Sequence, residues 1–265
     1  MQLFPQKNVK NGGDFMEIKQ WYDADGFTLN SVKRLGFSQC GPNGDLTIFE
    51  LLKMTSDIAT EDVTLRGTSS AFLREHNILR MVSRSSFRLH KMPKEGEVVL
   101  LTTAVEIPEE FQQVRSYEFS AEDGTPLISG VSTWIMVEAD THRIIPSEKF
   151  TLLPKSTISR THNCLPYGRI KAPSQMEFLS EYKIGYANLD SNGHTNNSWY
   201  GFFMMNSLPD SLRTKKFTDF RINYSKEATL GQTLGIYAHH DEEKRTITVV
   251  GKVDNVNSFE STLIY

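Results

Sequence analysis

The sequence predicts an α+β protein made of two similar halves, each an antiparallel sheet packed on one helix. Three observations lead to this prediction. The chain carries a weak internal repeat, a helical pattern follows the same motif in both copies, and a run of alternating strands follows each helical pattern.

The repeat is clearest where a short alternating stretch ends in glycine and an aromatic residue. Residues 31–37 (SVKRLGF) correspond to residues 180–186 (SEYKIGY), which lie 149 positions later. At the same offset, residues 43–45 (NGD) meet residues 192–194 (NGH). Separate matches at one offset favour a duplicated unit over chance similarity.

A helix is predicted after each copy of this motif. Thr47 and Asn196, again 149 positions apart, are good helix N-caps, and Glu50 completes a capping-box pattern with Thr47. The apolar face of the first helix consists of Ile48, Leu51, Leu52, Thr55 and Ile58. The second helix is apolar nearly all round, through Trp199, Tyr200, Phe202, Phe203 and Met204, before Pro209 stops it. We therefore expect the second helix to be enclosed on most sides.

Strands rich in Val, Ile, Thr and aromatic residues follow each helix. Residues 86–90 and 219–223 correspond at an offset of 133, which places about sixteen additional residues between helix and strand in the first half. Further strands are predicted at 98–107, 113–121 and 126–137, and at 233–239, 246–253 and 258–265. We expect an N-terminal unit over residues 1–140, a proline-containing linker over 141–177 and a C-terminal unit over 178–265.

Composition narrows the functional classes. With 38% hydrophobic and 23% charged residues the chain is typical of a folded globular protein, and a net charge of −3 gives no general case for nucleic-acid binding. Cys40 and Cys164 form no CxxC motif and fit a reducing compartment, and no metal spacing or phosphate loop predicts a cofactor. The first residues (MQLFPQKNVKNGGDF) contain no signal or transit peptide pattern, and no segment approaches ~20 apolar residues, so we expect a cytoplasmic protein without a membrane span.

One segment of the second half concentrates chemically useful side chains. Asp190, Asn192 and His194 alternate just before the N-cap Asn196, whereas residues 40–45 (CGPNGD) of the first half lack the acid and the imidazole at the matched places. An asparagine amide and a helix N-terminus can stabilise an oxyanion, and a histidine can move a proton near neutral pH. The same residue types are also common in turns and caps. The motif alone leaves both interpretations open; under the first, one half catalyses and the other mainly binds.

The pattern Asp190-x-Asn192-x-His194-x-Asn196-Asn197-x-x-Tyr200 resembles the active-site motif of plant and bacterial acyl-acyl-carrier-protein thioesterases. Glu227 stands where that family has a glutamate, and residues 133–136 (TWIM), followed by Ile145-Pro146, resemble the stretch that closes the family's first unit. The resemblance extends over most of the chain. It implies a tandem (double) hotdog, in which each half is an antiparallel sheet wrapped around a central helix. It also implies that the first half binds the acyl chain and that the second half holds the active site.

The resemblance further implies a substrate and a mechanism. The substrate would be a fatty acyl group on the 4'-phosphopantetheine arm of acyl carrier protein, released as free fatty acid without a cofactor. The site would consist of Asp190, Asn192, His194 and Glu227. Glu227, or alternatively Asp190, would activate a water, Asn192 and His194 would hold the carbonyl or the water, and Asp190 would orient the loop. The family often has a cysteine after the glutamate; this chain has Ala228, which disfavours a covalent cysteine mechanism.

Three alternatives stay open at this point. An acyl-coenzyme A thioesterase would use the same site with another carrier, a non-catalytic acyl-binding protein would explain Ala228 as lost activity, and a hotdog dehydratase would act on a 3-hydroxyacyl chain. The presence of all four site residues argues against the binding protein, and the Asn-rich motif does not suggest the dehydratase. Exposed sheet edges favour a homodimer. Residues expected to line the acyl chamber are Leu51, Leu52 and Met54, and basic candidates for contact with the acidic carrier are Arg88, Lys91, Lys94, Arg213, Lys215 and Lys216.

Overall fold

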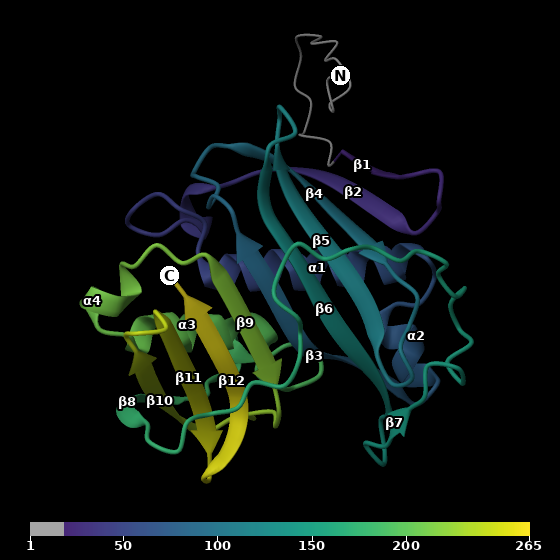
Figure 1. Cartoon of the computed structure of the whole chain (residues 1–265). Coiled ribbons are helices and arrows are strands. Elements are labelled where there is room, and N and C mark those ends of the chain that lie inside the picture. Colours follow the sequence, from purple (N-terminus) through teal and green to yellow (C-terminus); the bar gives the residue numbers. More distant parts are fainter. Residues whose placement is uncertain (1–18) are drawn as a thin grey trace.

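The strands of both halves join into one antiparallel sheet (Figure 1). The structure is a computed structural model and describes residues 19–265, so the prediction about a targeting peptide falls outside the described residues. The sheet has 12 strands in the order β1-β2-β4-β5-β6-β3-β9-β12-β11-β10-β8, and β7 pairs with β6. Among the described helices, none is long and apolar enough to cross a membrane.

The first half has a strand, a long helix, a short helix and then a run of strands. Its elements are β1 (Gln20–Tyr22), β2 (Thr28–Arg34), α1 (Ile48–Leu65), α2 (Ser70–Glu75), β3 (Ile78–Leu89), β4 (Val98–Val105), β5 (Gln113–Ala121), β6 (Pro126–Glu138) and β7 (Ile144–Ile145). The Thr47 hydroxyl accepts a hydrogen bond from the Glu50 backbone N–H, which confirms the predicted N-cap of α1.

The second half repeats this order in a shorter form. Its elements are β8 (Glu177–Lys183), α3 (Asn197–Ser207), α4 (Asp210–Arg213), β9 (Asp219–Tyr224), β10 (Thr233–Asp241), β11 (Thr246–Val253) and β12 (Val256–Ile264). Asn196 caps α3 by accepting a hydrogen bond from the Ser198 N–H, as predicted. The prediction of an α+β fold with two sheet-and-helix units is confirmed.

The two halves meet at a seam between β3 and β9. Inside the short edge strand β1, the first half runs β2-β4-β5-β6-β3 toward the seam. The second half runs β8-β10-β11-β12-β9 from its outer strand to the seam, so the equivalent strands follow the same order. β3 and β9 pair antiparallel, with Phe87 opposite Phe220 and their rings stacked 6.3 Å apart between centroids. The sheet therefore continues across the seam without an edge.

The two long helices pack against each other on the inner face of the sheet (Figure 1). Gly201 of α3 makes the close approach possible, because a Cβ atom there would lie 2.9 Å from a methyl carbon of Leu52 in α1. Tyr200, Phe203 and Met204 are buried, but Trp199 and Phe202 remain partly exposed. α3 is therefore enclosed on fewer sides than its composition predicts.

The additional residues of the first half form a longer helix and a different connection. α1 has 18 residues against 11 in α3, and the six-residue helix α2 follows it. Leu73 anchors α2, since it is buried in a small cluster with Met136 and Phe150. α2 packs beside β3, close to the second half. The offset change in the sequence predicted this insertion but not its structure.

The segment between β7 and β8 contains no helix or strand, yet it is tied to the sheet. The Ser86 hydroxyl of β3 donates a hydrogen bond to the Leu165 carbonyl at 2.6 Å, and Arg221 of β9 donates one to the Gly168 carbonyl at 2.6 Å. Side chains alternate along a strand, so Ser86 faces away from the core that holds Phe87. The segment thus crosses the seam on the outer face of the sheet.

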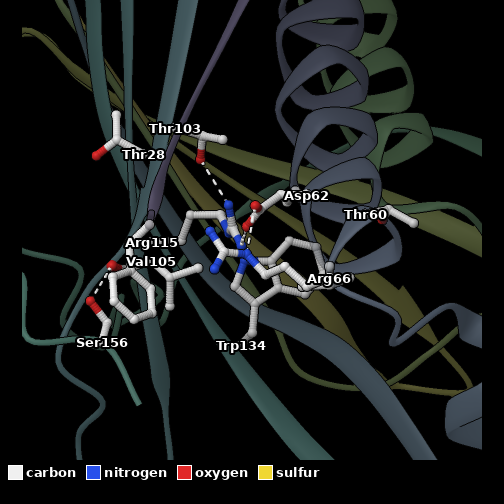
Figure 2. Close-up of polar contacts among 12 residues, drawn as sticks. Thr28, Thr60, Asp62, Arg66, Thr103, Val105, Arg115, Trp134 and Ser156 are labelled. Atoms are coloured by element: carbon white, nitrogen blue, oxygen red, sulfur yellow. Dashed lines mark hydrogen bonds and ion pairs between the residues drawn. The ribbon is translucent and has the colours of Figure 1, made fainter. Parts of the chain in front are cut away.

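A buried ion pair secures the C-terminal end of α1. Figure 2 shows the Asp62 carboxylate of α1 facing the guanidinium group of Arg115 in β5. The two groups lie 2.6 Å apart, and the Asp62 side chain is fully buried. Arg66 and Tyr22 each donate a further hydrogen bond to Asp62, at 2.8 and 2.7 Å. Burial alone would raise the pKa of Asp62, but the charge and hydrogen bond of Arg115 outweigh it and hold this pKa below its ordinary value.

Candidate active site

The loop that precedes α3 is a compact turn held by its own aspartate. The backbone N–H of Asp190 donates to the carbonyl of His194 at 2.8 Å, and Gly193 adopts a positive φ of 80° that closes the turn. The Asp190 carboxylate accepts hydrogen bonds from the backbone N–H of Asn192, at 2.8 Å, and from that of His194, at 3.4 Å. Asp190 therefore supports the loop from inside.

A second segment, after β9, is joined to this loop through Ala228. The backbone N–H and the hydroxyl of Thr195 both donate to the Ala228 carbonyl, at 2.9 and 2.7 Å. The Ala228 N–H in turn donates to the Tyr200 hydroxyl at 3.1 Å. These bonds connect the loop, α3 and the segment that carries Glu227.

The hydrogen bonds of Ala228 bring His194 and Glu227 into contact. Nδ1 of His194 lies 2.9 Å from a carboxylate oxygen of Glu227, although the two residues are 33 positions apart. Both side chains are partly exposed. Partial burial raises the pKa of Glu227 above its ordinary value, the nearby His194 lowers it, and Asp190 raises it again. A carboxyl group with a raised pKa beside an imidazole is typical of proton-transfer sites.

These side chains line a cavity of about 110 Å³ between the two halves. Asp190, Asn192, His194 and Glu227, the four residues predicted for the site, all line it. The first half contributes β3 and β6 rather than α1, through Arg80, Met81, Val82, Ser83 and Ile135. Leu51, Leu52 and Met54, expected to line an acyl chamber, are buried in the core and do not line this cavity.

The cavity wall that the first half contributes carries a cationic side chain, Arg80. The guanidinium group of Arg80 lies 4.6 Å from the ring centroid of Trp134 and donates to the Ala59 carbonyl and the Thr60 hydroxyl. Burial and the neighbouring Arg115 lower the pKa of Arg80 to about 9. Nothing in the sequence pattern singled out this arginine, because its role depends on packing against α1.

A further contact was also missed from the sequence. Arg74 of α2 reaches across from the first half, and its Nη2 atom donates to the side-chain oxygen of Asn192 at 2.6 Å. The same atom donates to the backbone carbonyl of Ser191. The two residues bonded through their side chains are 118 positions apart, and no local pattern could have linked them.

Sequence models of two domains match the chain. The model of the acyl-ACP (acyl-acyl carrier protein) thioesterase N-terminal domain matches residues 33–149, and that of the acyl-ACP thioesterase C-terminal domain matches residues 171–262. The chain belongs to the acyl-ACP thioesterase family. It is therefore related to thioester hydrolases over most of its length, and the resemblance inferred from the motif is confirmed.

Solved structures agree with this family at the level of the fold. An acyl-ACP thioesterase from Bacteroides thetaiotaomicron superimposes with a TM-score of 0.80 at 22% identity, over 89% of this chain and 97% of that one. A 12:0-ACP thioesterase from Umbellularia californica gives 0.77 at 14% identity, over 89% and 96%. No curated protein gives a significant sequence match. The double hotdog is thus confirmed.

The equivalent place in the first half of this thioesterase-family chain holds different chemistry. Backbone bridges pair Asp45 with Lys94 in the first half and His194 with Thr229 in the second. Lys94 therefore corresponds to Thr229, and the constant offset of 133, which would match Lys94 to Glu227, is wrong by two residues here. The Lys94 ammonium lies 2.8 Å from the Asp45 carboxylate. The first half therefore has an acid in an ion pair at the position where the second half has His194.

The position that often carries a cysteine in this family does not face the cavity. Ala228 is fully buried and does not line it. Its backbone, rather than its side chain, holds the site together through Thr195 and Tyr200. Replacement of the family's cysteine by alanine therefore leaves the contact between His194 and Glu227 in place.

Several basic side chains expected to meet an acidic carrier are already paired. Arg88 contacts Asp219, Lys94 contacts Asp45, and Arg213 contacts Asp210 within its own helix. These pairs reduce the positive charge that the predicted basic rim would present.

Proposed function

We propose that this protein hydrolyses fatty acyl-acyl carrier protein to free fatty acid, with its active site in the second half. The observation that carries the proposal is the 2.9 Å contact between His194 and Glu227 on the wall of a cavity that Asn192 also lines. Family membership supports the reaction class, and the cavity supplies the donor, the acid and the imidazole that the reaction needs.

In the proposed mechanism Glu227 is the general base. Its carboxylate takes a proton from a water as the water oxygen attacks the thioester carbonyl carbon. The oxyanion that forms accepts a hydrogen bond from the side-chain amide of Asn192, near the N-terminus of α3. The carbon–sulfur bond then breaks, and His194, in contact with Glu227, returns the proton to the departing sulfur. The products are a carboxylic acid and a free thiol.

Asp190 is proposed as a support for this machinery rather than as the base. Its carboxylate oxygen already accepts two backbone N–H groups from the loop, at Asn192 and His194. Such bonds fix the backbone from which the Asn192 and His194 side chains extend. Glu227, in contrast, accepts no hydrogen bond from the loop backbone among the described residues, so its carboxylate can receive a proton from water.

The test is an assay of the purified protein on acyl groups of several lengths, each presented on acyl carrier protein and on coenzyme A. The proposal expects hydrolysis with a higher kcat/KM on the protein carrier. A preference for coenzyme A would identify the acyl-coenzyme A alternative, and tight acyl binding without turnover would identify the non-catalytic one. The same series measures how long a chain the first half accepts.

Activity should fall in acid at a pH above the ordinary glutamate range. Glu227 must be ionised to accept a proton, and burial raises its pKa above 4.5, so kcat/KM is expected to decrease as the pH falls through this raised value. A pH series of kcat/KM, with circular dichroism at each pH to exclude unfolding, checks it. An acid limb centred at or below 4.5 would contradict the role of Glu227.

Thiol reagents should leave hydrolysis intact. Burial raises the pKa of Cys40, and it raises that of Cys164 to about 11, so both thiols are poor nucleophiles at neutral pH. Neither thiol lines the cavity. Treatment of the folded protein with iodoacetamide is therefore expected to leave kcat unchanged, with mass spectrometry reporting the extent of alkylation. Loss of activity in proportion to alkylation would restore a cysteine mechanism.

A further inference from the structure

The first half reaches into the active-site loop of the second through Arg74. Its Nη2 atom lies 2.6 Å from Oδ1 of Asn192 and also donates to the carbonyl of Ser191. α2, which carries Arg74, is capped by Ser69 and anchored by the neighbouring Leu73, which is 3% exposed. The guanidinium group is thus presented from a fixed element rather than from a free loop.

The chemistry of the two groups decides how the Asn192 amide is oriented. A side-chain amide has one acceptor end and one donor end, and rotation about its last bond exchanges them. A guanidinium group only donates, so only the oxygen of the amide can face Arg74. The NH₂ group must then point to the opposite side. Without Arg74, the amide could turn its oxygen toward an incoming carbonyl, which would repel it.

We propose that Arg74 is a positioning residue that holds the Asn192 amide with its donor end available to the thioester carbonyl. This inference rests on the proposed function, and it makes the active site a product of both halves. α2 belongs to the insertion of the first half, and neither α2 nor the short helix α4 at the corresponding place in the second half lines the cavity, so Arg74 acts through the loop that it contacts.

Kinetics of Arg74→Met and Arg74→Lys test the proposal. Loss of one oxyanion donor costs about 10²–10³ in kcat, and a misoriented donor should approach this loss, so we expect Arg74→Met to lower kcat by at least tenfold with little change in KM. Arg74→Lys keeps a cationic donor group without the planar fork, and its kcat should fall between those of the wild type and Arg74→Met. The matched control is Arg34→Met, an exposed arginine at the end of β2 that also donates to a backbone carbonyl; it should keep the wild-type kcat.

Two comparisons separate positioning from carrier docking. The loss in Arg74→Met should persist on a small acyl-N-acetylcysteamine thioester, which carries no protein; a loss confined to the acyl carrier protein substrate would overturn the proposal. In an Asn192→Ala background Arg74→Met should cause no further loss, because the group it positions is gone. Full additivity of the two losses would overturn it as well.

A readout without turnover keeps this inference distinct from the proposed function. In protein labelled with ¹⁵N-asparagine, the side-chain NH₂ resonances of Asn192 can be assigned by their disappearance in Asn192→Ala. We expect Arg74→Met to shift or broaden them, and Arg34→Met to leave them unchanged. Unchanged resonances in Arg74→Met would refute the positioning role. If the wild type hydrolyses no thioester, the proposed function fails, and the resonances still decide whether Arg74 orients Asn192.

Discussion

Glu227→Gln should lower kcat by about 10²–10⁴ while the protein stays folded, because this is the range that a positioned general base supplies. Glutamine has the size of glutamate and can still contact His194, but it cannot take a proton from water. The measurement is kcat on acyl carrier protein substrates, with thermal unfolding as the check on folding. Asn192→Ala is likewise expected to abolish most of the activity, through loss of the oxyanion donor.

The control for Glu227→Gln comes from the other half. Glu95 is an exposed glutamate beside the corresponding turn of the first half, and Glu95→Gln should keep the activity of the wild type. If Glu227→Gln retains more than about a tenth of the wild-type kcat, the carboxylate is not the base. Asp190 would then be the remaining acid on the cavity wall, and Asp190→Asn would decide its role.

Asp62→Asn should destabilise the protein by about 3–5 kcal/mol, the usual cost of removing one partner from a buried ion pair. The substitution keeps the shape of the side chain but leaves the buried charge of Arg115, which is 4% exposed, without its counter-ion. Urea unfolding at neutral pH measures the difference in free energy. Asp57→Asn is the matched control, because Asp57 lies on the exposed face of the same helix, and its cost should stay within about 0.5 kcal/mol.

The destabilisation caused by Asp62→Asn should depend on pH. The pKa of Asp62 is lower in the folded protein than in the unfolded chain, so its stabilising contribution is complete above the unfolded value of about 3.9 and is lost as the pH falls through the folded value. The difference in unfolding free energy between the wild type and Asp62→Asn should therefore narrow only below a pH of about 3.9. A gap that closes between pH 7 and pH 5 would show that Asp62 is not held ionised by Arg115.

Local patterns predicted most of the fold. The alternating segments 113–121 and 246–253 became β5 and β11 with the predicted bounds, and the caps Thr47 and Asn196 start their helices where expected. Each of these signals depends on a few neighbouring residues. Strand order and the pairing of β3 with β9 are long-range properties, and the repeat in the sequence indicated two units without indicating how they join.

The residues of the candidate site also separate into those with a local sequence signal and those without one. Asp190, Asn192 and His194 lie in one short motif, and Glu227 was found through the resemblance to a family. Arg74 and Arg80 were missed, because an arginine in a short helix and another in a strand carry no local signal of what they contact. The offset of 133 paired Lys94 with Glu227 instead of Thr229 for a similar reason. An alignment of the two halves at one strand does not show that the loop after that strand differs in length between them.

The segment that crosses the seam between β3 and β9 has a consequence for folding. In either half alone, residues 84–88 of β3 or residues 219–223 of β9 would be unpaired along one edge, and the bonds of Leu165 and Gly168 to opposite sides of the seam would have only one side to hold. The polypeptide should therefore melt as one cooperative unit, and a protease cut within the crossing segment would leave two fragments that stay associated. Expressing either half of the enzyme alone would expose an unpaired strand edge that is prone to association, rather than yield a small protein that folds by itself.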